Sequence, residues 1–120
     1  MYTKNLNETN VNTSGGKVEQ VFTFSSGDKK VVERVVADEN LHYMHAIFNE
    51  GEGLPLHFSN ANVYMSVIRG NLTIALDNFE PNIYGAGKLL KIPEGTQMNV
   101  KNTHGETLEI FIVKSPPPKG

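Results

Sequence analysis

Short apolar segments, separated by turn-forming residues, run along most of the chain. Within them hydrophobic and polar positions alternate with a period of two, which is typical of β-strands with one buried face. Met98 and Val100, for example, alternate with Gln97, Asn99 and Lys101. No segment keeps a helical period of 3.6 residues over three turns. The pattern therefore predicts an all-β chain.

We expect nine strands and a short tenth one near 82–84. The nine span 17–24, 30–37, 41–48, 54–59, 63–69, 72–77, 88–92, 96–101 and 107–114. Four valines between Lys29 and Asn40 would also fit one face of a helix, but β-branched residues favour a strand. Gly70-Asn71, between two apolar runs, is a two-residue hairpin signal. Many short strands without helices predict a sandwich or a barrel.

The alternation also predicts which side chains face the core. In addition to Met98 and Val100, the expected core positions are Leu72, Ile74, Leu76, Leu108, Ile110 and Ile112. The segment 57–67 is apolar on both faces, because Phe58 and Tyr64 lie on the face opposite to Val63 and Met65. We expect a second sheet or a partner subunit to cover the face of Phe58 and Tyr64.

The two ends of the chain differ from the part between them. Residues 1–16 form a polar, asparagine-rich arm that ends in Ser14-Gly15-Gly16. Residues 115–120 form a proline-rich tail, which cannot join a sheet ladder because proline lacks the N–H group; we expect it to hang free or lie extended. The domain itself is expected to span 17–114.

Length and composition exclude several classes of function. The chain has 120 residues, which is one domain, and a net charge of −2 from 11 basic and 13 acidic residues. This balance argues against a nucleic-acid partner and against a polybasic membrane binder. There are no cysteines, hence no disulfides and no thiolate ligands. Since the start is polar and no apolar run reaches the roughly 18 residues of a membrane span, we expect a soluble, cytoplasmic protein.

Two stretches resemble the paired motifs of the cupins, small β-barrel proteins of jelly-roll type. The first motif of that family contains His-x-His and a glutamate between two glycines, and the second contains Pro-x-Gly, a histidine and an asparagine. The positions that match are Gly51, His57, Gly70, Gly87, Pro93, Gly95 and Asn102. The resemblance covers roughly residues 45–114 and implies a cupin-type jelly-roll β-barrel.

The same alignment departs from the family at the metal ligands. Metal-binding cupins hold one divalent ion with two histidines and a glutamate of the first motif and the histidine of the second. Here only His57 remains, and Ser59, Val63 and Met98 occupy the other three places. The resemblance therefore implies the scaffold without a complete metal site, and we expect no cofactor. A divalent ion held by other ligands stays open as an alternative.

Other residues offer only incomplete metal sites. His42 and His45 lie three positions apart, so on a strand they point to opposite faces and only one of them could join His57. His104 falls in a turn. A pair of His57 and Met98 would suit a soft ion such as Cu(I), but a firm divalent site needs three or four protein ligands.

Catalytic arrangements find little support. Ser59 shares a face with His57, but no acid is positioned to orient the histidine, which argues against a serine hydrolase. Three of the four methionines, Met44, Met65 and Met98, fall in apolar strands. They fit either an ordinary soft core or the wall of an apolar ligand pocket.

The favoured hypothesis is a non-catalytic protein that binds or senses a small molecule. Its pocket would be formed by His57, Ser59, Val63, Met65 and Met98, with the histidine and the serine as the polar groups. One alternative is a metal-dependent cupin enzyme, an oxygenase or an isomerase, with altered ligands. Another is a structural dimerisation module with a filled barrel. The resemblance also implies a homodimer.

Overall fold

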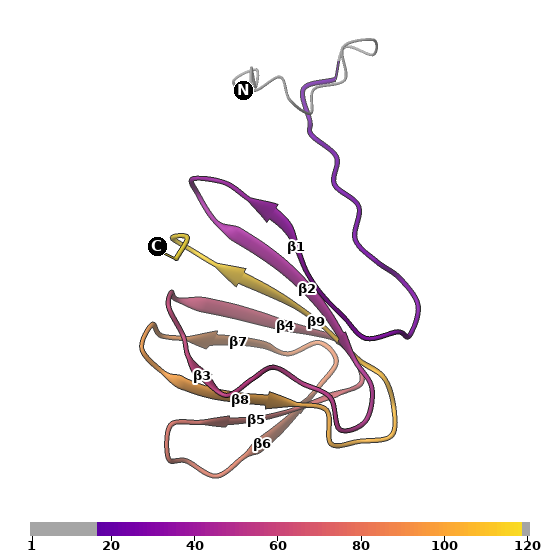
Figure 1. Ribbon diagram of the computed structural model, residues 1–120, viewed down its shortest axis with the longest axis vertical. Helices are drawn as coiled ribbons and strands as arrows, with labels where there is room; N and C mark the ends of the chain where they lie inside the picture. The colour runs from indigo at the N-terminus through magenta and orange to yellow at the C-terminus, as the bar shows by residue number, and fades with distance from the viewer. Residues whose placement is uncertain (1–16, 119–120) are drawn as a thin grey trace.

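Two antiparallel sheets face each other in the computed structural model, which describes residues 17–118 (Figure 1). The larger sheet has the order β1 (Val31–Ala37), β2 (His42–Phe48), β9 (Leu108–Lys114), β4 (Val63–Arg69) and β7 (Leu89–Ile92). The smaller has the order β3 (His57–Phe58), β8 (Gln97–Lys101), β5 (Asn71–Leu76) and β6 (Asn82–Gly85). Within this range there is no helix, and so none that could cross a membrane. The all-β prediction is confirmed.

The core lies between the inner faces of the two sheets. Its members are Ala46, Phe48, Val63, Met65, Val67, Leu72, Ile74, Ile92, Met98, Val100, Leu108, Ile110 and Ile112. Buried and more exposed residues alternate along β8, β5 and β9 as expected, and Leu76 is half-buried at the end of its strand. Period-two patterning therefore predicted the inner face of each of these strands.

The expected first strand, 17–24, is wrong. That segment joins neither ladder in the described chain, and its last residue, Phe24, lies over the outer face of the larger sheet. There the Phe24 ring lies 4.9 Å from the His45 ring and 5.0 Å from the Phe111 ring. Ser25 donates hydrogen bonds to the Glu33 carboxylate from its backbone N–H and its hydroxyl. These contacts hold the end of the segment over β2 and β9, and they hold the residue that follows it to β1.

The expected strand 54–59 is reduced to its middle. Only His57–Phe58 pairs as a strand, with β8. Gly53 forms an isolated bridge to Lys101, and Leu54 donates its backbone N–H to the oxygen of Val100. Proline at position 55 interrupts the ladder because it has no N–H to donate.

Gly70-Asn71 is not a hairpin, because β4 and β5 belong to different sheets. Gly70 has a φ of 79° and turns the chain from one sheet to the other. A Cβ at this position would collide with the backbone oxygen of Thr107. The glycine is needed for a corner with close backbone packing.

The second apolar face of 57–67 is divided between the two sheets: Phe58 lies on the outer face of the smaller sheet, and Tyr64 lies on the outer face of the larger one. Phe58 and Ile68 are 63% and 47% exposed, while Tyr64 and Ser66 are half-buried. The part of our expectation that named a second sheet is therefore wrong.

The chain ends differ in how much of them the structure describes. The predicted polar arm, 1–16, lies outside the described residues, as do the last two positions of the tail. Ser115 donates its backbone N–H to the oxygen of Asn62 and its hydroxyl to the oxygen of Asn40. The start of the tail is thus held against two loops and takes no part in either ladder.

Candidate functional site

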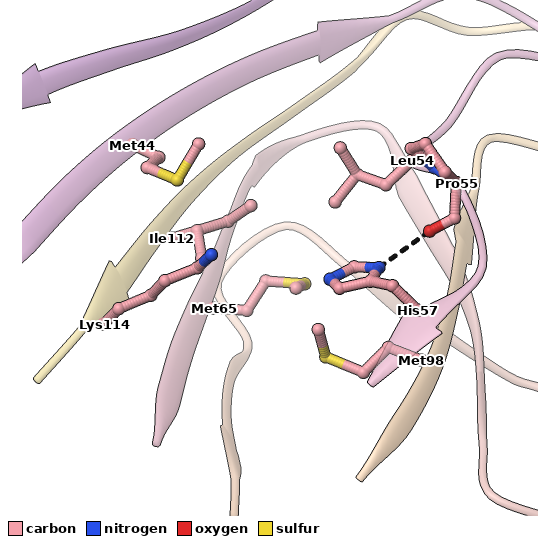
Figure 2. A pocket seen from close by; sticks show the side chains of 8 residues that line it. All are labelled: Met44, Leu54, Pro55, His57, Met65, Met98, Ile112 and Lys114. Carbon is pink, nitrogen blue, oxygen red and sulfur yellow. Dashed lines mark hydrogen bonds between the residues drawn. The ribbon is translucent and has the colours of Figure 1, made fainter. Parts of the chain in front are cut away.

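A cavity of about 290 Å³ lies between the two sheets. Its lining is almost wholly apolar, with two nitrogen-bearing side chains among thioether and alkyl groups (Figure 2). The lining residues are Met44, Leu54, Pro55, His57, Met65, Met98, Ile112 and Lys114.

Strand register explains why these residues meet. In the smaller sheet His57 is the cross-strand partner of Met98. In the larger sheet Ile112 is the partner of both Met44 and Met65, on its two sides. The inner faces of the sheets therefore bring the two groups to opposite walls, and Figure 2 shows the side chains directed into the same space.

One hydrogen bond fixes which ring nitrogen of His57 faces the cavity. Its Nδ1 lies 2.7 Å from the backbone oxygen of Pro55. A carbonyl oxygen can only accept, so Nδ1 carries the proton and donates it. The other nitrogen, Nε2, has no hydrogen-bond partner in residues 17–118, and in Figure 2 it is turned toward Met65. In the neutral ring Nε2 is then a free acceptor.

Lys114 is the other polar side chain of the lining. It continues the buried face of Leu108, Ile110 and Ile112 by two positions, and it is half-buried. Burial lowers the pKa of its amino group below the usual value, and the nearby charge of Arg34 lowers it further. The cavity thus combines an acceptor on one wall with a partly desolvated cation on the other.

Of the five pocket residues proposed from the sequence, three are in the lining: His57, Met65 and Met98. Ser59 is buried elsewhere: its hydroxyl donates to the oxygen of Pro93 at 2.9 Å and accepts the N–H of Thr96 at 3.1 Å. Val63 is fully buried in the core and does not reach the cavity.

Met44 had been named only as a possible pocket wall. The remaining lining residues were missed, and one of them, Lys114, carried a usable signal. Leu54 and Pro55 reach the cavity from a loop, whose position the alternation of strands cannot predict. Lys114 was detectable in principle, because it follows three buried residues at the same parity and is charged. A lysine on an otherwise apolar strand face indicates either that the strand has been assigned the wrong register or that the lysine belongs to a functional site.

The donors present do not fit the divalent ion of metal-binding cupins. No group of three or more His, Cys, Asp or Glu residues suited to a metal occurs between residues 17 and 118. The cavity offers one free imidazole nitrogen among thioethers, whereas divalent ions of this class take several nitrogen or oxygen ligands.

The remaining histidines do not complete a site. His45 lies on the outer face of the larger sheet, fully buried, with Nδ1 2.7 Å from a Glu33 oxygen and Nε2 2.6 Å from a Glu109 oxygen. His42 points to the opposite, inner face, as expected from the spacing, but it is not part of the cavity lining. His104 is half-buried in its turn, with Nδ1 3.3 Å from the Thr103 hydroxyl.

The double-sheet barrel, with its cavity between the sheets and glycines at its corners, is the architecture of a cupin, and comparison with known proteins agrees. The chain is 36% identical over 103 residues to an uncharacterized protein of Methanocaldococcus jannaschii, an alignment that covers 85% of this chain and 89% of the relative. A crystal structure of an RmlC-like cupin family protein with a double-stranded β-helix fold from the same organism has a TM-score of 0.81 and 34% identity, over 84% of this chain and 94% of that one. The chain therefore belongs to the RmlC-like cupin family.

More distant structures share the fold alone. An RmlC-like cupin protein from Desulfovibrio desulfuricans matches with a TM-score of 0.65 and 23% identity, over 74% of this chain and 84% of that one. A cupin superfamily protein from Desulfitobacterium hafniense matches with a TM-score of 0.66 and 9% identity, over 77% of this chain and 83% of that one. No family model matches the sequence.

Proposed function

We propose that this cupin is a non-catalytic protein that binds or senses a small, mostly apolar molecule in the cavity between its sheets. The observation that carries the proposal is the lining: thioether, alkyl and proline groups surround a space of about 290 Å³, with only His57 and Lys114 as polar side chains. Concave, largely apolar pockets with a few placed polar groups are typical of small-molecule sites.

The size of the cavity limits the ligand. At roughly 30 Å³ for each water-sized group, the space has room for about ten non-hydrogen atoms. This corresponds to a small aromatic molecule or a medium-length aliphatic chain. The nitrogen of His57 that faces the cavity supports a ligand with one hydrogen-bond donor, such as a hydroxyl group.

The test uses 1-octanol, a neutral probe of suitable size, and titration calorimetry. Leu54→Trp places a larger side chain in the lining and should abolish binding. Leu56→Trp is the matched control, since Leu56 is in the same loop, is 60% exposed and does not line the cavity. Binding that is absent from the natural sequence, or that survives in Leu54→Trp, would contradict the proposal.

We also propose that the protein is a homodimer. Support comes from the segment before β1, where Val21 and Phe22 are 65% and 40% exposed, and from β1, which pairs within the described chain only with β2. An open strand edge beside an apolar extended segment favours pairing between two copies. Sedimentation equilibrium should give twice the chain mass, and changing both Val21 and Phe22 to Asp should give monomers. A natural sequence that is monomeric at all concentrations would refute this.

A further inference from the structure

The amino group of Lys114 has no anionic partner among residues 17–118. It lies on the inner face of β9, where the preceding residues of the same parity are buried core, and Figure 2 shows its amino group beside Ile112 at the cavity. No carboxylate, hydroxyl or carbonyl oxygen of residues 17–118 accepts a hydrogen bond from this amino group or forms an ion pair with it. An ammonium group that is partly removed from water without a partner is costly, and such a group is stabilised by an incoming anion.

The charges around Lys114 strengthen this attraction. Arg34 of β1 is close enough for its charge to act on the lysine, and its guanidinium likewise has no partner in the described chain. His42 of β2 is the cross-strand neighbour of Lys114 on one side, and uncharged Val63 of β4 is the neighbour on the other. His57 is on the opposite wall. No acidic side chain is among these neighbours, and the charge of Arg34, which acts on the lysine, is positive.

Resting on the binding function proposed above, we propose that the ligand is a small amphiphilic carboxylate whose anionic head is held by Lys114 and whose apolar body lies among the three methionines. The lysine supplies a charge-assisted hydrogen bond, with Arg34 adding long-range attraction. The methionines supply a flexible apolar wall that accepts an aliphatic or aromatic body. A hydroxyl on that body would donate to Nε2 of His57, since that nitrogen is the free acceptor.

The proposal is tested with three probes of one length: octanoate, 1-octanol and octylamine. By calorimetry at neutral pH, octanoate should bind about tenfold to a hundredfold more tightly than octanol, the range expected for one hydrogen bond to a charged group. Octylamine should bind more weakly than octanol, because it would bring a second positive charge to the same place.

Lys114→Met removes the charge but keeps an unbranched side chain, so octanoate should lose its advantage while octanol still binds. Lys88→Met is the control: Lys88 is an exposed lysine outside the cavity lining, and this change should leave the ratio unaltered. Melting curves of both variants establish that they fold.

A second readout needs no variant. Octanoate stays ionised above neutral pH, while Lys114 loses its proton as the pH rises through its lowered pKa, so the advantage of octanoate over octanol should already decline below the usual lysine value of 10.5.

The outcomes separate the two proposals. If octanol binds and octanoate binds no more tightly, the carboxylate proposal is overturned while the binding function stands. An advantage that persists in Lys114→Met would also overturn it. If none of the three probes binds, both proposals fail.

Discussion

His45→Ala is expected to be among the most destabilising single substitutions outside the core. The imidazole is fully buried on the outer face of the larger sheet and contacts a carboxylate at each nitrogen, at 2.7 Å to Glu33 and 2.6 Å to Glu109. Ionised carboxylates only accept, so the ring can donate to both only when both nitrogens carry protons. The substitution removes one donor from each carboxylate, and it removes a ring that lies 4.8 Å from the Phe111 ring.

The expected loss in the free energy of unfolding is about 3 kcal/mol. Removing one partner from a buried pair costs about 3–5 kcal/mol. The lower end applies because Glu33 is still bonded to Ser25 and Glu109 to Arg69, and both glutamates are partly exposed. At about 4 °C for each kcal/mol in a domain of this size, the melting temperature should fall by about 12 °C.

Urea denaturation followed by circular dichroism measures the change. His42→Ala is the matched control: it is the same residue type on the same strand, half-buried on the other face, and its side chain has no hydrogen bond or ion pair in the described chain. It should cost no more than about 1 kcal/mol. If His45→Ala costs as little as His42→Ala, the buried imidazole network does not stabilise the sheet as we argue.

Three further predictions concern single positions. His57→Ala should lower stability by only about 1 kcal/mol, the value of one hydrogen bond, yet should weaken the binding of 1-octanol in calorimetry; unchanged affinity would exclude His57 from the site. The pKa of Glu33 is lowered chiefly by the backbone N–H of Ser25, so its ionised form stabilises the fold above pH 4.5 and this contribution disappears as the pH falls through the lowered pKa. Urea titrations at several pH values should therefore show a weaker acid dependence in Glu33→Gln, and an identical dependence would refute the assignment. Gly70→Ala should cost more than about 2 kcal/mol through backbone strain and overlap, whereas Gly87→Ala, with a similar positive φ of 93° and open space around it, should cost less; equal losses on melting would show that close packing at Gly70 is unimportant.

The sequence predicted the strands well because their signal is local. Alternation along a strand decides which side faces inward, and so Met98, Val100 and Ile112 could be assigned to the core before any contact was known. The segment 17–24 has an equally strand-like composition, but whether it pairs with a strand depends on the contacts that the residues after it make. Ser25 attaches to Glu33, eight positions later, and no local pattern encodes that contact.

The candidate site was predictable only where strands form it. Met65 and Met98 follow from parity together with the cupin motifs, and His57 follows from its place in the first motif. Ser59 has the same parity as His57, but its hydroxyl bonds to the Pro93 turn, a contact between segments 34 positions apart. Predicting Lys114 required a different inference, namely that a charged residue which continues a buried strand face belongs to a functional site.

The most direct test of the binding site is the NMR spectrum of protein labelled at the methionine methyl groups. Met44, Met65 and Met98 all line the cavity and come from three different strands of the two sheets. Titration with octanoate should shift all three methyl signals together, saturating at one ligand per chain, and Leu54→Trp should abolish the shifts. If neither octanoate nor 1-octanol moves these three signals, the space between the sheets is not a ligand site.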